Sequence, residues 1–200
     1  MLQIAGPPAP ETLRRDQLAR RQRIVRTALR ALANGEYDQV KISDVARDSG
    51  VALGTLYRYF ASKEHLFAAA FVEWQSALKK KLEKERPAGA SEAERLREVF
   101  HHTIRAFQLQ PQFYRVVMML NATTDTYAAD LYQSVSVQFH DTVQMAFTGP
   151  FDTDHDAIYG TVNSVLDGSL RSWVMNRATI QDVYVNVDNA IRLIYEYKPE

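Results

Sequence analysis

The chain has 200 residues, of which 46% are apolar, and its 24 Lys and Arg balance 24 Asp and Glu, with no cysteine. This composition is that of an ordinary globular protein, and the absence of cysteine excludes disulfide and thiol chemistry. No stretch approaches the roughly 18 consecutive apolar residues of a membrane span, and the first residues lack the pattern of a signal peptide. We therefore expect a cytoplasmic protein, and no cofactor is indicated.

Charge is divided unevenly along the chain. Residues 1–86 hold 16 Lys and Arg against 10 Asp and Glu, whereas residues 87–200 hold 8 against 14. A basic half within a neutral protein is typical of a chain with an anionic partner at one end. Chance clustering of charges on solvated surfaces is the alternative that composition alone leaves open.

Helical periodicity runs through the chain without sustained period-two alternation, so the predicted fold is all-α. Residues 1–12 are predicted to form a disordered arm. The predicted helices then span, in chain order, residues 14–34, two short segments between 41 and 60, 62–86, segments starting near 91 and 111, 126–147, 153–177 and 179–197. Ser91 and Glu94 form a capping box at one of these starts.

The stretch from Lys41 to Leu66 carries the most informative pattern. Ser43 can cap a short helix, Gly50 tolerates the positive φ of a tight turn, and a second short helix turns Leu56 and Phe60 inward. Two short helices joined by a glycine turn, with polar and aromatic groups outward, are typical of a helix-turn-helix. A helical hairpin whose tyrosines merely pack is the alternative.

The outward groups of this pattern suit DNA. Gly54 lets the backbone approach a duplex closely, and Thr55 offers a hydroxyl to phosphate and a methyl to thymine. Tyrosine hydroxyls can donate to phosphates, and Lys and Arg add charge. The predicted DNA-contacting residues are Lys41, Ser43, Leu53, Gly54, Thr55, Tyr57, Arg58, Tyr59 and Lys63.

The run GVALGTLYRYFASKEHL, from Gly50 to Leu66, resembles the signature of the TetR family of bacterial repressors. With the helix before it, the resemblance covers about residues 16–67. Ala52 stands where many members have a capping Ser, so the second short helix is expected to begin without a side-chain cap. The positions that usually contact DNA in the family are occupied here by Lys41, Thr55, Tyr57, Tyr59 and Lys63.

The resemblance implies an N-terminal three-helix helix-turn-helix domain at residues 13–61 and a larger helical domain at 62–200. The second domain would hold a ligand cavity and the interface of a homodimer that binds a palindromic DNA operator. The C-terminal half also resembles one branch of the family, the repressors of bacterial sterol catabolism. The matching elements are Arg95-Leu96, Arg105-Ala106-Phe107-Gln108, Pro111, Met119, and Trp173 with Arg177-Ala178.

Large apolar side chains with few charges among them follow residue 66, which favours a large apolar ligand over a small ionic one. A sterol-derived acid or its coenzyme A thioester is the expected effector, with a fatty acyl thioester as the alternative. Most such residues in any helical domain form core, and the sequence does not separate the two roles. The candidate pocket residues are Phe71, Trp74, Phe100, Ile104, Phe107, Phe113, Tyr114, Val117, Met118, Leu131, Val135, Phe139, Leu166 and Trp173.

A row of small residues spaced four apart marks the predicted helix 153–177. Such rows let helix backbones approach closely, either across a dimer, as the family resemblance implies, or inside one monomer. The candidate dimer residues are this row and the apolar stripe of the last helix: Gly160, Ser164, Gly168, Ser172, Val183, Val187, Ile191 and Ile194.

No catalytic or metal-binding pattern is evident. Asp152, Asp154 and Asp156 alternate like calcium-loop ligands but lack the glycine and distal glutamate of such a loop, so a helix start is favoured. The predicted function is a ligand-released DNA-binding repressor rather than an enzyme. A DNA-free ligand-binding helical module is the rival interpretation, and activation instead of repression stays open.

Overall fold

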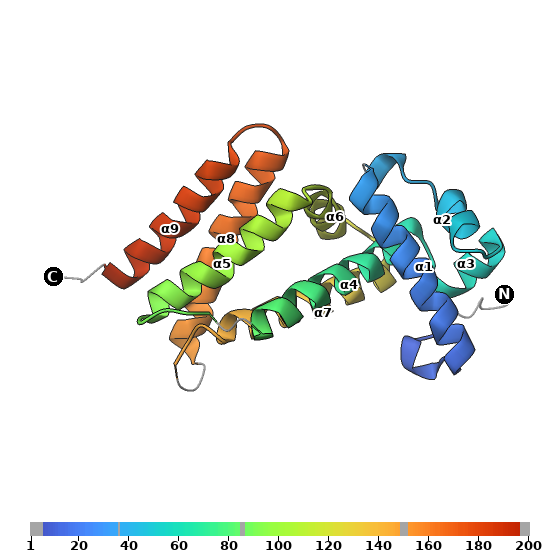
Figure 1. The fold of residues 1–200 in the computed structure, drawn as a ribbon, viewed down its shortest axis with the longest axis horizontal. Helices are drawn as coiled ribbons and strands as arrows, with labels where there is room; N and C mark the ends of the chain where they lie inside the picture. The colour runs from blue at the N-terminus through green and yellow to red at the C-terminus, as the bar shows by residue number, and fades with distance from the viewer. Residues whose placement is uncertain (1–5, 36, 85–86, 149–151, 197–200) are drawn as a thin grey trace. The chain divides into compact units, whose positions relative to one another are not determined.

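The structure, a computed structural model, describes residues 6–35, 37–84, 87–148 and 152–196. These residues form nine α-helices and two 3-10 helices without a strand (Figure 1), so the all-α prediction is confirmed. None of the described helices is long and apolar enough to cross a membrane. The elements are η1 Pro10–Thr12, α1 Arg15–Asn34, η2 Tyr37–Gln39, α2 Ile42–Asp48, α3 Leu53–Tyr59, α4 Lys63–Lys84, α5 Glu92–Leu109, α6 Gln112–Asn121, α7 Thr126–Gln144, α8 Thr153–Val174 and α9 Ile180–Glu196.

The chain divides into two compact units. The N-terminal unit comprises Met1–Gln75 and Arg115–Val135, and the C-terminal unit comprises Ser76–Tyr114 and Ser136–Glu200. Helices α4, α6 and α7 each begin in one unit and end in the other. The predicted boundary after residue 61 falls inside the N-terminal unit and stays a prediction.

The first helices of the N-terminal unit pack through one apolar stripe. Ile24, Ala28 and Leu32 recur on α1 at a spacing of four residues, and all three are fully buried. This spacing keeps them on one face of a helix with 3.6 residues per turn. The guanidinium Nε of Arg23 donates to the carbonyl of Ser49 at 2.9 Å, which ties α1 to the turn between α2 and α3.

The segment before α1 is partly folded. Pro10–Thr12 form a 3-10 helix, and the Thr12 hydroxyl donates to the carbonyl of Ala9 at 2.7 Å. The prediction of a disordered arm at residues 1–12 is therefore wrong for this turn, because Pro10 fixes the backbone and Thr12 closes it. Residues 1–5 of the predicted arm lie outside the described residues.

Two local signals set helix ends that the pattern of apolar residues could not. The amide of Glu94 donates to the Ser91 hydroxyl at 3.2 Å, which confirms the capping box at the start of α5. Helix α8 ends at Val174 rather than at the predicted Arg177, because Asn176 adopts a left-handed φ of 57°. The amide of Arg177 then donates back to the carbonyl of Ser172 at 2.8 Å, as in a Schellman motif.

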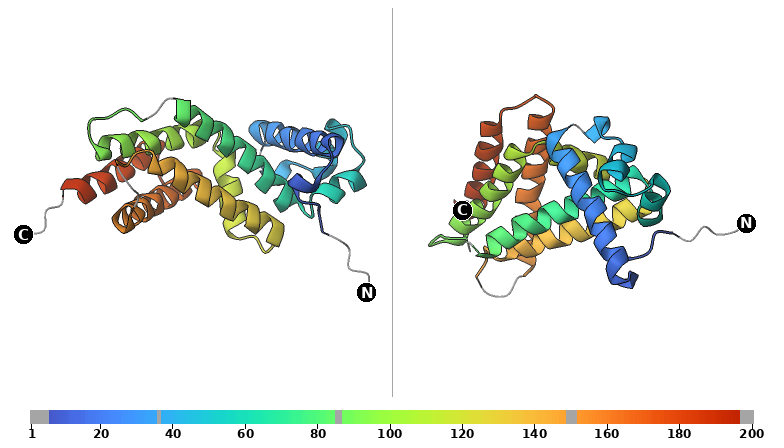
Figure 2. Two further views of the ribbon diagram at one scale, coloured as in Figure 1. Left: turned by 90° about the horizontal axis from the view of Figure 1, so that it is seen from below. Right: turned by 45° about the vertical axis from the view of Figure 1, so that its right-hand side comes forward.

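The C-terminal unit is built around α9, which packs against both α5 and α8 and lies beside α8 in every view (Figure 2). Val183, Val187 and Ile191 form a stripe on α9 that is completely buried. At the edge of this packing, Asp188 of α9 accepts from Nε of Arg97 at 3.2 Å and lies 2.8 Å from Nε2 of His101, both on α5. An apolar stripe flanked by an ion pair therefore joins the helices of this unit.

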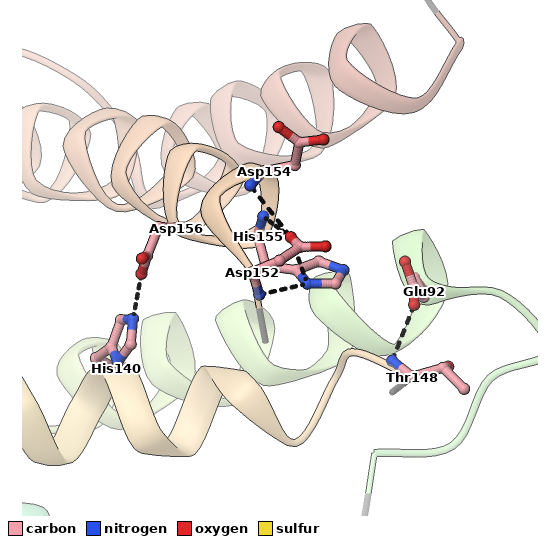
Figure 3. A network of polar contacts seen from close by, with 7 residues as sticks. All are labelled: Glu92, His140, Thr148, Asp152, Asp154, His155 and Asp156. Atoms are coloured by element: carbon pink, nitrogen blue, oxygen red, sulfur yellow. Dashed lines mark hydrogen bonds and ion pairs between the residues drawn. The ribbon is translucent and has the colours of Figure 1, made fainter. Parts of the chain in front are cut away.

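Polar side chains fix the junction of α7 and α8 in the C-terminal unit (Figure 3). The carboxylate of Asp152 caps α8 by accepting from the amides of Asp154 and His155 at 3.1 and 3.0 Å. Asp156 instead pairs with Nε2 of His140 on α7 at 2.8 Å. Two of the three alternating aspartates thus have different partners, and the predicted helix start at Asp152 is confirmed.

Candidate nucleic-acid interface

The turn between α2 and α3 has the geometry that the sequence predicts. Gly50 has a φ of +68°, where a side chain would be strained. The Ser49 hydroxyl and the amide of Val51 both bond to the carbonyl of Ala46, at 3.1 and 3.0 Å, and close the turn. Helix α3 follows Ala52 without a side-chain cap, as expected. The turn therefore sets the direction of α3 from α2.

Helix α3 has one buried and one exposed face. Leu56 and Phe60 are fully buried, as predicted. The opposite face presents large side chains to solvent: Leu53 is 42% exposed and Tyr57 is 48% exposed. Gly54 and Arg58 are also exposed, and Thr55 is half-buried. This face is what α3 offers to a partner.

Two residues of the predicted interface have other positions than expected. Tyr59 is only 6% exposed, so its outward placement is wrong. It lies three residues after buried Leu56, on the same side of the helix. Ser43 does not cap α2, because the helix begins at Ile42 and Lys41 is its N-cap residue, without a side-chain hydrogen bond. Ser43 is exposed in the first turn instead.

The lysines of the predicted interface differ in their surroundings. Lys41 is exposed. The ammonium of Lys63 donates to the carbonyl of Tyr37 at 2.8 Å and lies 4.3 Å from the centre of the Tyr37 ring. Burial, together with the neighbouring charges of Glu64 and Asp38, raises the pKa of Tyr37 to about 12. Lys63 thus stabilises the N-terminal unit itself and keeps two further N–H donors for an anion.

Four side chains of the N-terminal unit contact one another in series, and we call this series a stack although one of its contacts is edge-on. The Arg21 guanidinium lies 4.9 Å from the centre of the Phe60 ring, Phe60 meets His65 edge-on at 5.3 Å, and His65 stacks on Tyr127 at 5.3 Å. Burial lowers the pKa of His65 to about 4, with Arg21 adding to the effect and Asp125 opposing it. The neutral imidazole accepts the amide of Ala61 at Nδ1. The stack joins α1, the end of α3, α4 and α7.

A groove of about 570 Å³ runs beside the exposed face of α3 in the N-terminal unit. It was not predicted, because a segment rich in Pro and Gly has no periodicity from which its packing could be inferred. Gly6 lies so close to the Tyr127 hydroxyl that a side chain there would collide with it. The lining residues are Gly6, Pro7, Pro8, Leu13, Gln17, Tyr57, Arg58, Tyr59, Ala61 and Tyr127.

The predicted pocket residues are divided between the two units. In the C-terminal unit, Phe107 meets Tyr114 edge-on at 5.5 Å, and the Tyr114 hydroxyl donates to Asp167 at 2.6 Å (main-chain oxygen) and 2.7 Å (carboxylate). The N-terminal unit holds Phe71, Trp74, Val117, Met118, Leu131 and Val135, and the C-terminal unit holds Phe100, Ile104, Phe107, Phe113, Tyr114, Phe139, Leu166 and Trp173. Their contact with a ligand stays a prediction.

The predicted dimer residues also separate into two groups. Val183, Val187 and Ile191 are fully buried within the protomer, so their assignment to a dimer interface is wrong, and Ile194 is half-buried. Helix α9 instead exposes Val185 at 44% and Leu193 at 55%. The row of small residues on α8, called the small row below, lies at the surface, with exposed Gly160, Ser164 and Gly168 and half-buried Ser172.

Comparison with known proteins gives concordant matches in both halves. Residues 24–70 match the family model of bacterial regulatory proteins, tetR family, and residues 89–194 match a tetracyclin repressor-like C-terminal domain. The chain is 30% identical over 179 residues to the HTH-type transcriptional repressor KstR of Mycobacterium tuberculosis, covering 89% of this chain and 81% of that protein. It is 28% identical over 184 residues to KstR of Rhodococcus jostii, covering 89% and 84%.

Solved structures show the same fold. A TetR transcriptional regulator from Rhodococcus sp. RHA1 superposes with a TM-score of 0.77 at 23% identity, covering 94% of this chain and 100% of that chain. The regulator FadR from Bacillus subtilis, in complex with stearoyl-CoA, gives a TM-score of 0.64 at 18% identity, covering 86% and 96%.

Proposed function

Because this chain belongs to the TetR family of bacterial regulatory proteins, we propose that it is a ligand-released repressor that binds a palindromic operator as a homodimer. Membership makes it a helix-turn-helix transcriptional regulator. The operator geometry, the dimer and the effector are the proposed parts. They are supported by the exposed face of α3, the small row of α8 and the apolar interior.

The observation that carries the DNA-binding proposal is Gly54. A Cβ at this position would meet nothing in the protomer, so the fold does not need a glycine there. A glycine inside a helix costs about 1 kcal/mol relative to alanine. Its presence on the exposed face of α3, beside Tyr57 and Arg58, fits a partner whose backbone approaches closely. A duplex major groove is such a partner, since it admits a helix and its phosphates attract cations and hydroxyls.

The dimer proposal rests on the same reasoning applied to α8. A Cβ at Gly160 or Gly168 would also meet nothing, although both are in the helix interior. The hydroxyls of Ser164 and Ser172 donate to the carbonyls of these two glycines at 2.7 and 3.0 Å. The row therefore presents a surface without unpaired donors, suited to close contact with a second copy. Two recognition helices would then read half-sites roughly 34–36 Å apart.

The effector proposal is an elongated apolar molecule, a sterol-derived acid or its coenzyme A thioester, with a fatty acyl thioester as the alternative. The large buried apolar side chains of both units support it. The sequence resemblance to the sterol-catabolism branch favours the first class, and the FadR structure with stearoyl-CoA favours the second. Because α4 begins at Lys63, directly after the helix-turn-helix, a shift of α4 would move α3, the helix proposed to contact DNA. An effector that binds the DNA-releasing conformation more tightly than the DNA-binding one by a few kcal/mol would suffice to release the operator.

The test is a mobility-shift assay of the purified protein with DNA fragments that flank its own gene, first at low salt and then with candidate effectors. We expect a discrete shifted band that sterol acids, their thioesters or acyl thioesters release, and a matching rise in Tm by mass action. Ligand binding without any DNA retention would favour the DNA-free module instead. Release only by small polar metabolites would overturn the apolar effector and leave the repressor standing.

A further inference from the structure

Gln75 is a polar side chain in an apolar part of the N-terminal unit. It lies on α4 and is only 8% exposed. Its Nε2 donates to the carbonyl of Val135 on α7 at 3.2 Å. Its Oε1 is buried and has no hydrogen-bond partner among the described residues. The side chain therefore keeps one unused acceptor in the interior.

The carbonyl of Val135 determines which end of the Gln75 side-chain amide is left without a partner. If Oε1 and Nε2 of Gln75 exchanged places, two oxygens would face each other at the carbonyl of Val135 and the amide nitrogen would lose its hydrogen bond to that carbonyl. The unused group is therefore the oxygen, which can only accept. A buried acceptor without a donor destabilises a fold, and methionine would fill similar space without that cost. The donor that such an acceptor needs is supplied by a bound ligand or by an ordered water.

The neighbourhood of Gln75 matches the predicted ligand site. Phe71 lies one turn earlier on α4 and is 3% exposed, and its ring stacks on Trp74 with centroids 5.5 Å apart. On α7, whose Val135 carbonyl accepts from Gln75, Leu131 lies one turn before Val135. Apolar sites commonly hold a few polar groups that fix ligand orientation. Gln75 is placed to be such a group.

We propose that Oε1 of Gln75 accepts a hydrogen bond from a hydroxyl group of the effector, and that this bond selects a hydroxylated effector over its ketone. The proposal rests on the proposed function, in which an apolar effector releases the repressor. A ketone has no hydrogen to donate and would bring a second oxygen against Oε1. Sites built around such a bond reject the analogue that lacks the donor more strongly than apolar contacts reject a change of shape.

The experiment compares hydroxyl and ketone members of matched pairs. The probes are 5β-cholan-24-oic acids with a hydroxyl or an oxo group at ring position 3, 7 or 12, and 12-hydroxystearoyl- and 12-oxostearoyl-coenzyme A. Dissociation constants are measured by calorimetry on wild type and on Gln75→Met. For at least one pair we expect wild type to prefer the hydroxyl member by about tenfold or more. The variant should lose that preference and keep its affinity for the ketone.

Controls separate the possible failures. Gln133→Met makes the same substitution at an exposed site on α7 and should leave every constant unchanged. Gln75→Leu serves if the methionine variant does not fold. An equal preference in wild type and variant, or no preference in any pair, would overturn the role of Gln75, because a buried water would then satisfy Oε1. If wild type binds none of the probes, the proposed effector class fails together with this inference, while operator binding is judged separately by mobility shift.

Discussion

The imidazole of His65 lies nearly parallel to the phenol of Tyr127, with ring centroids 5.3 Å apart and planes inclined by 15°. His65 is in the first turn of α4, directly after the helix-turn-helix, and Tyr127 is in the first turn of α7. Phe60, at the end of α3, packs edge-on against the same imidazole ring. These two ring contacts therefore link the start of α7 to the end of α3.

Replacing Tyr127 with alanine should weaken this connection. Loss of the stack should lower the free energy of unfolding by about 0.5–1.5 kcal/mol, the usual range for an aromatic pair. It should also reduce the effector-induced loss of operator affinity, measured by titrating effector against a DNA complex. Tyr127→Phe keeps the ring and should behave as wild type. Full effector response in Tyr127→Ala would show that the stack is structural only.

The buried imidazole makes stability depend on acid. The pKa of His65 is lowered to about 4 in the fold, whereas an unfolded histidine titrates near 6.5. Between these values the unfolded chain binds a proton that the folded chain does not, so stability is full above about pH 6.5 and falls as the pH drops toward 4. The loss attributable to His65 between pH 7 and 4.5 should be about 2–3 kcal/mol.

Urea unfolding at a series of pH values measures this effect. His65→Asn keeps an acceptor near the Ala61 amide but cannot titrate in this range. Its unfolding free energy should therefore fall less steeply with acid than that of wild type. Parallel curves for the two proteins would mean that His65 is charged in the fold or exposed to solvent.

Helix positions follow from local signals, and for this reason the sequence predicts them well. Capping by Ser91 and the glycine turn at Gly50 act within a few residues. The side on which Tyr59 lies was also encoded, because a residue three after buried Leu56 is about 60° from it around the helix. The prediction nevertheless grouped Tyr59 with Tyr57 as an outward phosphate donor, whereas the structure has Tyr59 buried.

Tyr57 and Tyr59 should therefore give opposite results on substitution by alanine. Tyr57→Ala removes a side chain that is 48% exposed and should weaken operator binding by about 1–3 kcal/mol with little change in Tm. Tyr59→Ala removes a buried ring and should lower the unfolding free energy by about 3 kcal/mol or more. Mobility shift and thermal unfolding on both variants make the comparison. A large stability loss in Tyr57→Ala would reverse the assigned faces of α3.

Lys41 and Lys63 should also give different results on substitution by alanine. If exposed Lys41 neutralises a phosphate, Lys41→Ala should reduce the slope of log affinity against log salt by about 1. Lys63→Ala should in addition lower Tm, because its ammonium holds the Tyr37 carbonyl at 2.8 Å. Filter binding between low and physiological salt measures the slopes. A flat dependence in wild type would exclude phosphate-led binding.

The surfaces used between molecules are less accessible from sequence than the helices. The stripe of Val183, Val187 and Ile191 was correctly recognised as an apolar face of α9. Periodicity does not say whether such a face meets its own protomer or a partner, and here α5 and α8 cover it. The exposed side chains Val185 and Leu193 carry no periodic signal of their own, and only the fold shows them uncovered.

The small row of α8 gives the sharpest test of the proposed dimer. A Cβ at Gly168 meets nothing in the protomer, so Gly168→Trp should leave the monomer folded, and removing a helix glycine should even favour α8 by several tenths of a kcal/mol. At an interface where two helices approach closely, however, the indole would hold the backbones apart. We expect wild type to sediment as a dimer and Gly168→Trp as a monomer with native helicity and weakened operator binding. Lys80→Trp places the same side chain on an exposed position of α4 and should stay dimeric. A dimeric Gly168→Trp with unchanged operator affinity would move the interface away from α8, and a monomeric wild type at micromolar concentration would remove the dimer from the proposed function.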